Sequence, residues 1–330
     1  MQEIEIIVNL WLQNMGKWLL IPMQLFSFLG TQNAYLIMIS ILYWCIDNQL
    51  GKRLGVILLL ENGFNMGFKW LFRAPRPYWI DTRVQALSTE SSFGVPSGHA
   101  MISIGFWGEI ASWVKRNWGK ICIVLIIFFI GISRIYLGVH FLSDVIVGWL
   151  FGISILLLMR MIEKPFIEWF HPRPFNQKII LAFLSSLSII IVLMGLKYIF
   201  SNWELPKDWI NIAQQTAPGS QIDPMRTGDV LILAGTWFGM ISGFILITKN
   251  GDFETNGKII HKVLRFLIGF VVILLLAFGP NFIFQKTDSI FSYVATFVQY
   301  GLIGFWIAAL APSLFLKLKL LKKIPSGGKK

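Results

Sequence analysis

The chain has 330 residues, of which 55% are hydrophobic and 15% aromatic, and its mean hydropathy is +0.65. These values exclude an ordinary soluble domain. The net charge of +12 does not indicate nucleic-acid binding, because the basic residues flank apolar runs, as they do in membrane proteins. Cys45 and Cys122 both lie in apolar runs, so we expect packing residues and neither a disulfide nor a metal site.

Residues 1–32 are expected to form an amphipathic segment at the membrane interface. The segment begins with acidic residues and lacks the basic region of a secretory signal. Its apolar residues recur at helical spacing, at Ile4, Ile7, Val8, Trp11, Met15 and Trp18. This spacing predicts a helix that lies in the plane of the interface, the alternative being the first turns of an ordinary core helix.

The rest of the sequence predicts an all-α fold, a polytopic bundle of about nine transmembrane helices. The predicted spans are 33–47, 53–72, 98–114, 121–139, 142–162, 179–200, 229–248, 263–284 and 290–316. The first five carry the motifs described below and define a core of residues 33–162. For residues 163–316 we expect packing, oligomerisation or a substrate lid, and residues 317–330 form a basic tail.

The distribution of lysine and arginine predicts the orientation of the bundle. With nine spans, one face collects 19 of the 29 basic residues and the other face ten. Because cytoplasmic loops are enriched in these residues, the tail is expected in the cytoplasm and the N-terminus outside. All three motifs then fall on the extracytoplasmic side. We predict the plasma membrane of a prokaryote, or the endoplasmic reticulum if the host is eukaryotic.

The first informative pair is His140 and Asp144, at the start of the fifth span. Residues four apart share one face of a helix, so the carboxylate can accept a hydrogen bond from one ring nitrogen. This fixes the tautomer and leaves the other nitrogen able to attack an electrophile. Alone, such a pair is more often a local stabiliser of the helix.

A second string, Pro96-Ser97-Gly98-His99, begins the third span. Glycine permits a close backbone approach, and the amides of a helix start point toward an anion. The hydroxyl of Ser97 adds a donor, and His99 can protonate a departing oxygen. The simpler interpretation is an ordinary helix start with an interfacial histidine.

Three cations complete the set. Lys69 lies near the end of the second span, Arg76 precedes Pro77 in the following loop, and Arg134 follows Ser133 near the end of the fourth span. A charge at membrane depth costs about 2.5–3.5 kcal/mol, so it usually has a partner or a function. Arginine matches phosphate oxygens in a bidentate manner, although snorkelling explains any one of these residues alone.

Together, in this order and at one face, the three strings resemble the signature of the type 2 phosphatidic acid phosphatase superfamily, also called the vanadium-haloperoxidase-like phosphatases. The resemblance covers about residues 34–160. It implies a hydrolase that uses no metal or other cofactor and forms a covalent phospho-histidine intermediate. It further implies His140 as nucleophile, Asp144 as its orienting group and His99 as general acid, with Lys69, Arg76, Ser97, Gly98 and Arg134 holding the phosphate.

A site at the membrane edge suits a phosphorylated lipid or a polyprenyl pyrophosphate, so we expect lipids and not nucleic acid as partners. The sequence leaves the oligomeric state open. Residues 68–79, 96–101 and 133–141 also resemble glucose-6-phosphatase, which makes a sugar phosphate the second candidate. Asp144 departs from that family, which lacks a carboxylate there.

Two rival classes remain, a transporter or flippase and a binding protein with an inactive site. Polar groups that cluster at one face and not at the midplane disfavour the first. Intact His99, His140 and Asp144 disfavour the second. Glu61 and Glu109, inside predicted spans, are expected to form structural hydrogen bonds, the alternative being a proton path to the site.

Overall fold

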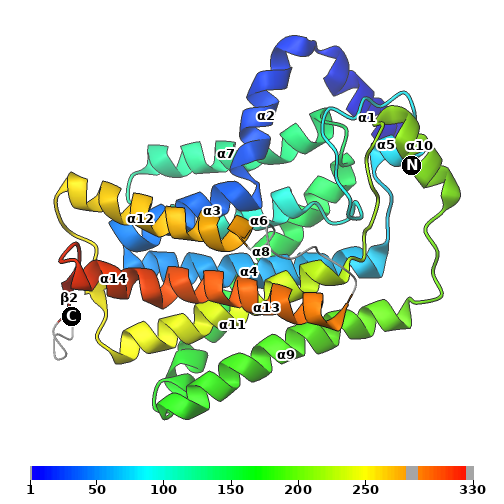
Figure 1. Cartoon of the computed structure of the whole chain (residues 1–330). Coiled ribbons are helices and arrows are strands. Elements are labelled where there is room, and N and C mark those ends of the chain that lie inside the picture. The colour runs from blue at the N-terminus through cyan, green and yellow to red at the C-terminus, as the bar shows by residue number, and fades with distance from the viewer. Residues whose placement is uncertain (1, 280–288, 325–330) are drawn as a thin grey trace. The chain divides into compact units, whose positions relative to one another are not determined.

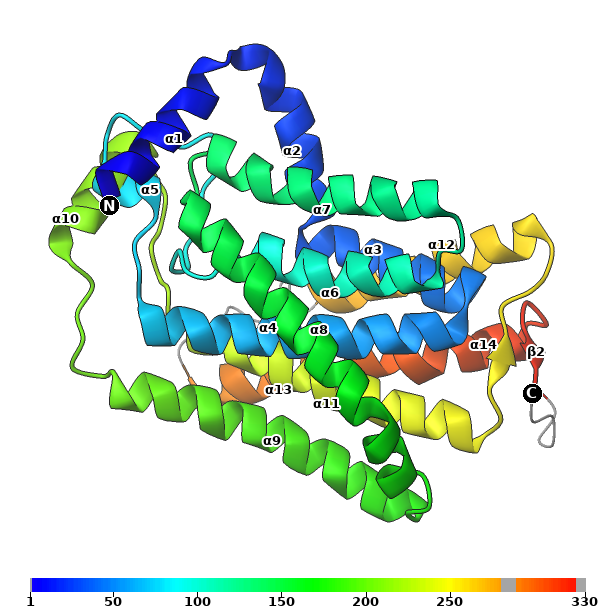
Figure 2. The same ribbon diagram turned by 180° about the vertical axis from the view of Figure 1, so that it is seen from behind.

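The computed structural model describes residues 2–279 and 289–324 and is mostly helical (Figures 1 and 2). The helices and helical turns are α1 (Gln2–Asn14), η1 (Lys17–Leu19), α2 (Leu20–Leu29), α3 (Gln32–Ile41), η2 (Leu42–Ile46), α4 (Asn48–Phe72), α5 (Pro77–Ile80), α6 (Gly98–Trp113), α7 (Asn117–Tyr136), α8 (Leu142–Phe170), α9 (Phe175–Ile199), α10 (Lys207–Thr216), α11 (Thr227–Lys249), α12 (Ile259–Phe278), α13 (Ile290–Phe305), η4 (Trp306–Leu310) and α14 (Ala311–Lys317). Two short strands, β1 (Phe253–Glu254) and β2 (Lys322–Lys323), pair in antiparallel register.

Each predicted span overlaps one or more helices among the described residues, and the stretch 280–284 of the span predicted at 263–284 lies outside them. Six helices there are long and apolar enough to cross a membrane, and a seventh crossing results if the helices on either side of a 57° bend near Gly30 count as one span. The predicted count of nine is not confirmed. The reason is physical, since α6 has only 16 residues and α4 contains charged side chains at both ends and in its middle.

The chain divides into two compact units, each built from separated segments. Unit 1 contains Met1–Tyr35, Leu60–Met161 and Leu193–Arg226, and unit 2 contains the remaining residues. Several long helices pass from one unit to the other, so the units do not coincide with halves of the sequence. The motif residues all belong to unit 1.

Within unit 1, helix α8 lies very close to the start of α6. A Cβ added to Gly148 would lie 2.8 Å from the carbonyl oxygen of Ser97, and one added to Gly152 would lie 2.5 Å from that of Met101. Only glycine allows such an approach without moving a backbone. The pair Gly148 and Gly152 therefore places the histidine-bearing start of α6 against the first turns of α8, beside α7 (Figure 2).

Helix α1 packs within unit 1 through Ile6, which joins a core cluster with Val84 and Phe141, and through Asn9. Asn9 is fully buried and donates hydrogen bonds to the carbonyl oxygens of Ile135 (2.8 Å) and His140 (3.1 Å). The apolar residues that recur at helical spacing in this segment are largely exposed, including Trp11 and Trp18. A helix that buries Ile6 and Asn9 but exposes large apolar side chains such as Trp11 and Trp18 is suited to a lipid interface.

Unit 2 is held together partly by aromatic donors. The hydroxyl of Tyr43 donates to the carbonyl oxygen of Ala308 at 2.8 Å, and the indole of Trp44 donates to that of Ile307 at 3.0 Å. These carbonyls lie in η4, a π-helical turn whose wider winding alters the regular hydrogen-bond ladder. The two side chains therefore fix η2 against the last described helices of the same unit.

Candidate active site

The structure brings all eight predicted site residues into unit 1, from five separate places in the chain. They come from the end of α4, the turn before α5, the start of α6, the end of α7 and the turn that leads into α8. The side chains of Lys69, Arg76, Arg134, His140 and Asp144 are almost completely buried.

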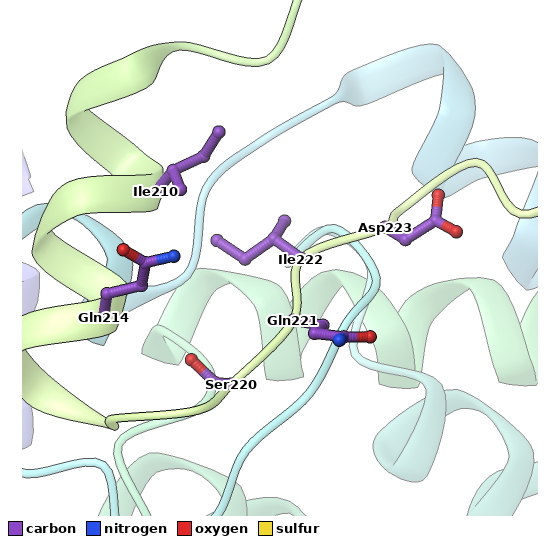
Figure 3. Close-up of a pocket in the computed structure, with 6 residues that line it drawn as sticks. All are labelled: Ile210, Gln214, Ser220, Gln221, Ile222 and Asp223. Carbon is purple, nitrogen blue, oxygen red and sulfur yellow. The ribbon is translucent and has the colours of Figure 1, made fainter.

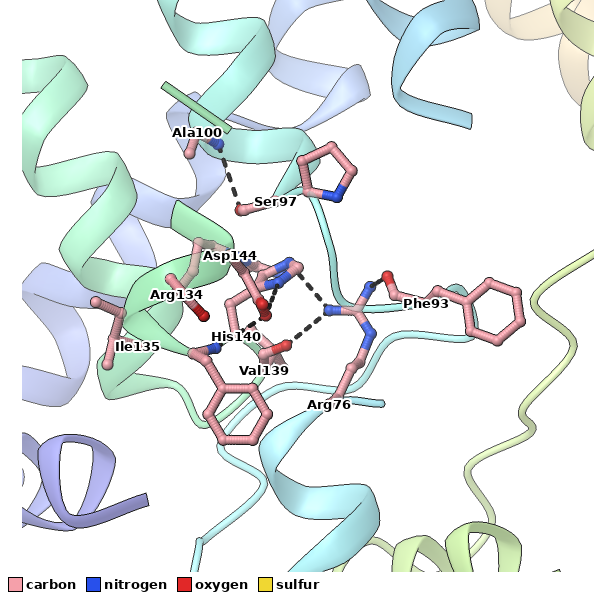
Figure 4. A network of polar contacts seen from close by, with 12 residues as sticks. Arg76, Phe93, Ser97, Ala100, Arg134, Ile135, Val139, His140 and Asp144 are labelled. Atoms are coloured by element: carbon pink, nitrogen blue, oxygen red, sulfur yellow. Dashed lines mark hydrogen bonds and ion pairs between the residues drawn. The ribbon is translucent and has the colours of Figure 1, made fainter. Parts of the chain in front are cut away.

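His140 lies between Asp144 and Arg76 (Figure 4). Its Nδ1 is 3.1 Å from Oδ2 of Asp144, and its Nε2 is 3.0 Å from a terminal nitrogen of Arg76. A guanidinium only donates, so Nε2 must be the acceptor and Nδ1 must carry the proton. Asp144 is fixed in turn by the backbone amide of Phe141, which donates to the same Oδ2 at 2.9 Å.

The tautomer predicted from the sequence is thus the one that these contacts require. The geometry differs slightly from the prediction, because His140 lies in the turn before α8 and only Asp144 lies inside the helix. The carboxylate still reaches back to the ring, since a residue in the first turn of a helix lies close to the residues that precede it.

Arg76 and Lys69 are held by the loop that precedes α6. Arg76 donates from Nε to the carbonyl oxygen of Ser92 (2.6 Å), and from its terminal nitrogens to those of Phe93 (3.1 Å) and Val139 (2.8 Å). Lys69 donates to the hydroxyl of Ser92 (3.2 Å) and to the carbonyl oxygen of Phe93. Both cations therefore depend on the position of residues 92–93.

Arg134 forms an ion pair with Glu90 and donates to the hydroxyl of Ser27. Sequence reasoning missed both partners, because neither belongs to a motif and Ser27 lies more than 100 residues away. The acidic charge of Glu90 within a cationic segment was the one signal that could have found it. Glu90 faces the same cations that would bind a phosphate.

The string Pro96-Ser97-Gly98-His99 adds donors at the start of α6. Ser97 is the N-cap, its own amide donates to the carbonyl oxygen of Asp144 at 3.0 Å, and its Oγ accepts from the amide of Ala100 (Figure 4). The amides of Gly98 and His99 lie in the first turn and so have no acceptor within the helix. A Cβ on Gly98 would lie 3.0 Å from the side-chain oxygen of Asn65.

Burial and charge set the protonation of two groups in the loops. Burial, followed by the positive charge of Arg76, lowers the pKa of His140 well below its ordinary value, so the ring is neutral at neutral pH. Burial alone would raise the pKa of Glu90. The nearby positive charges, led by Arg134 and Arg76, outweigh that effect and lower the pKa of Glu90 to about 2.

Two buried nitrogens of the cluster have no hydrogen-bond partner among the described residues, Nε2 of His99 and Nε of Arg134. Buried donors are normally satisfied, so these atoms indicate a ligand that accepts hydrogen bonds. An anion with several oxygens, set among three cations and a helix start, would satisfy them. The arrangement can bind a phosphoryl group next to Nε2 of His140.

The two carboxylates inside predicted spans differ. Glu109 accepts from Arg160 at 3.2 Å and so joins α6 to α8, as expected for a structural role. Glu61 is fully buried, and its carboxylate lies against Gly105 of α6.

A separate hollow of about 300 Å³ lies in unit 1 beside α10 (Figure 3). Its lining residues are Ile210, Gln214, Ser220, Gln221, Ile222 and Asp223. None of the predicted site residues belongs to this lining, so the hollow is not the candidate active site.

Comparison with known proteins agrees with this geometry. A sequence model described as the PAP2 superfamily matches residues 51–168, which contain all eight predicted site residues. A second, described as the transmembrane extension of PAP2 superfamily phosphatases, matches residues 231–323. The chain belongs to the PAP2 superfamily. The predicted resemblance to the type 2 phosphatidic acid phosphatase superfamily is thereby confirmed, and the chain is an integral membrane protein.

Two curated relatives of this chain are phosphatases by name. Glucose-6-phosphatase catalytic subunit 1 of Rattus norvegicus is 28% identical over 153 residues, which is 38% of this chain and 43% of the relative. Sphingosine-1-phosphate phosphatase 1 of the same species is 29% identical over 136 residues, or 39% of this chain and 32% of the relative. This chain thus spans less than half of the length of these two curated relatives.

A solved structure is also similar, that of a transmembrane PAP2-type phosphatidylglycerolphosphate phosphatase from Bacillus subtilis. It is 25% identical, with a TM-score of 0.43, and the match covers 50% of this chain and 86% of that one.

Proposed function

We propose that this protein is a membrane phosphatase that hydrolyses a lipid phosphate or polyprenyl pyrophosphate through a phospho-histidine intermediate, without a metal. The observation that carries the proposal is the contact set of His140. A carboxylate holds the proton on Nδ1, and the lone pair of Nε2 faces a cluster of buried cations.

In the first step, Nε2 of His140 attacks the phosphorus of the substrate and an N–P bond forms. The P–O bond to the lipid alcohol breaks, and His99 gives its proton to the departing oxygen. Negative charge grows on the equatorial oxygens, where Lys69, Arg76 and Arg134 stabilise it. Asp144 stabilises the positive charge that develops on the imidazole ring.

In the second step, water attacks the phosphorus of the intermediate. His99, now neutral, takes a proton from that water, the N–P bond breaks, and inorganic phosphate leaves. The amides of Gly98 and His99 and the hydroxyl of Ser97 lie at the helix start that would bind the phosphate oxygens. Each step balances without a metal-bound water. No group of three or more metal-binding side chains occurs among residues 2–279 and 289–324.

Counted over the nine spans predicted from the sequence, the distribution of basic residues supports an extracytoplasmic site, in the plasma membrane of a prokaryote, with the N-terminus outside. A substrate with its head group at the interface and its tail in lipid could reach such a site. The name of the related sphingosine-1-phosphate phosphatase supports a phosphorylated lipid.

A sugar phosphate is the second candidate, because several glucose-6-phosphatases are among the relatives. Asp144 favours the lipid phosphatases, since the glucose-6-phosphatase resemblance lacks this carboxylate.

The test is phosphate release by the purified protein in detergent with EDTA. The panel contains phosphatidic acid, phosphatidylglycerol phosphate, undecaprenyl pyrophosphate, sphingosine phosphate and glucose 6-phosphate, and the control is His140→Ala. Release from a lipid that the variant loses would support the proposal. Release from glucose 6-phosphate alone would favour the second candidate. No release by folded protein from any substrate would favour a transporter or an inactive binding protein.

A further inference from the structure

Residues 200–224, called the cover from here on, fold back onto the phosphate-binding motif. The cover belongs to unit 1, although it follows α9 in the chain. It contains α10, which lies beside α5 and α1 in both views (Figures 1 and 2). The cover lies between the stretches that the two family models match, 51–168 and 231–323.

The first contact reaches the loop that holds the cations. The ring of Trp203 packs edge-on against the ring of Phe93, with centroids 5.5 Å apart and planes at 73°. Phe93 is fully buried, and its carbonyl oxygen accepts hydrogen bonds from Lys69 and Arg76. Trp203 therefore contacts the residue that holds two of the three cations.

The second contact reaches α5, directly after Arg76. Trp209 in α10 packs on Trp79, with ring centroids 6.2 Å apart. The guanidinium of Arg76 lies over the same Trp79 ring, 5.9 Å from its centroid. The hydroxyl of Thr216 donates to the carbonyl oxygen of Tyr78 at 2.9 Å. α10 thus restrains the helical turn that begins just after the arginine.

The third contact reaches the end of α4. The guanidinium of Arg73 lies 3.9 Å from the ring centroid of Phe200, and the indole of Trp70 donates to the carbonyl oxygen of Pro224 at 2.9 Å. Trp70 is the neighbour of Lys69 in the chain and is almost completely buried. Both ends of the cover are therefore fixed near the lysine.

From these contacts we infer that the cover is a positioning element for the phosphate site, and that Trp203 and Trp209 are its positioning residues. They act through Phe93 and Trp79, which set the places of Lys69 and Arg76. This inference rests on the proposed function. It also predicts that a segment outside the matched family stretches tunes the affinity of this chain for phosphate.

The test compares Trp203→Ala, Trp203→Phe and Trp118→Ala in the full-length protein. Trp118 is 63% exposed at the start of α7 and controls for the loss of an indole. Two quantities are measured, the inhibition constant of vanadate and the hydrogen exchange of residues 90–97. The second needs no activity, and it follows the amide of Gly94, which donates to the carbonyl oxygen of Ala74 at 2.9 Å.

For Trp203→Ala we expect the vanadate inhibition constant and KM to rise together by about 2- to 10-fold, the range for loss of an aromatic pair. Exchange in residues 90–97 becomes faster. A phenyl ring can still meet Phe93 edge-on, so Trp203→Phe returns both quantities to near wild type. Trp118→Ala changes neither.

Unchanged exchange together with unchanged vanadate inhibition in Trp203→Ala would overturn the inference. Faster exchange with unchanged inhibition would also overturn it, because the contact would then be structural only. If Trp203→Ala does not accumulate in membranes, Trp209→Ala and Thr216→Val test the cover from α10. A wild-type protein that neither turns over nor binds vanadate would instead refute the proposed function, and the exchange result would still report on the contact.

Discussion

A terminal nitrogen of Arg76 lies 3.0 Å from Nε2 of His140 and donates to the atom proposed to attack phosphorus. In the structure this hydrogen bond occupies the lone pair of Nε2. A phosphate that accepts hydrogen bonds from Arg76 in its place would free that lone pair when the phosphorus atom arrives. Substrate binding and activation of the nucleophile would thus be coupled through one guanidinium.

Arg76→Lys is therefore expected to lower kcat/KM by about 10- to 100-fold. A lysine keeps the charge but cannot reach Ser92, Phe93, Val139 and His140 together, and charge-assisted hydrogen bonds contribute about 1.5–3 kcal/mol each. The measurement is steady-state kinetics on the best substrate of the panel. Arg83→Lys, at an exposed ion pair in the same loop, is the control. Equal kinetics for the two variants would argue against the coupling.

Asp144→Asn should reduce kcat by up to about 10⁴-fold, the effect of removing the carboxylate that orients a catalytic histidine. An amide can present its nitrogen to Nδ1 and so favour the wrong tautomer of His140. Single-turnover assays would show slow formation of the phospho-enzyme. Glu109→Gln, which neutralises a carboxylate paired with Arg160, should leave this rate unchanged. An Asp144→Asn protein with normal kcat would mean that the pair only stabilises the helix start.

The acidic fall of kcat/KM should have its midpoint below pH 6.5. The lowered pKa of His140 keeps the ring neutral, and therefore nucleophilic, at pH values where a free histidine is protonated. The pKa of His140 also affects stability, because it is lower in the folded protein than in the unfolded chain. As the pH drops below 6.5, the unfolded chain binds a proton at this histidine before the folded protein does, so the free energy of unfolding decreases. Rates corrected for the second ionisation of the substrate, near pH 6, provide the check. A midpoint above pH 6.5 would contradict the burial argument.

Glu90→Gln should strengthen inhibition by inorganic phosphate and also lower kcat. The carboxylate, with its pKa of about 2, is ionised across the working range and competes with phosphate for Arg134. Its removal frees the arginine for the product, while Arg134 loses the partner that orients it. The expected drop in the phosphate inhibition constant is about 10-fold, from the strength of a charge-assisted bond. Weaker inhibition would mean that orienting Arg134 outweighs the competition.

Gly148→Ala should destabilise the protein by about 1–3 kcal/mol, the usual cost of overpacking. The new methyl would lie 2.8 Å from the carbonyl oxygen of Ser97, and backbone must move to relieve the clash. The start of α6 would then shift away from α8. Thermal unfolding in detergent measures the effect. Gly195→Ala is the control, since a methyl there meets nothing within 4 Å. Equal unfolding temperatures for the two variants would refute the close packing.

The sequence allowed the centre of the site to be predicted because its chemistry is local. His140 and Asp144 are four residues apart, and Ser97, Gly98 and His99 are consecutive, so short-range geometry alone places each group. Lys69, Arg76 and Arg134 were identified as candidates because charged residues near apolar runs usually have a partner or a function. Their convergence depended on the family resemblance, since spacing says nothing about which helix ends meet.

What escaped prediction lies in loops and in distant segments. Glu90 and Ser92 carry no periodicity, and Asn9 and Trp203 reach the site only because separated parts of the chain meet in unit 1. A single sequence does not indicate which residues far apart in the chain contact each other. The span count differed for a related reason, because Lys69, which belongs to the candidate site, adds to the charges that reduce the apolarity of α4.

The three-segment composition of unit 1 has a consequence for biogenesis. During translation, His99 and His140 leave the ribosome well before Trp203, Trp209 and Pro224. Until those residues emerge, the cations near Phe93 lack the aromatic surfaces that surround them in the finished protein. Contacts between distant segments form late and slowly. The nascent protein should therefore complete the candidate site near the end of membrane insertion, in an order set by translation and not by the family motif.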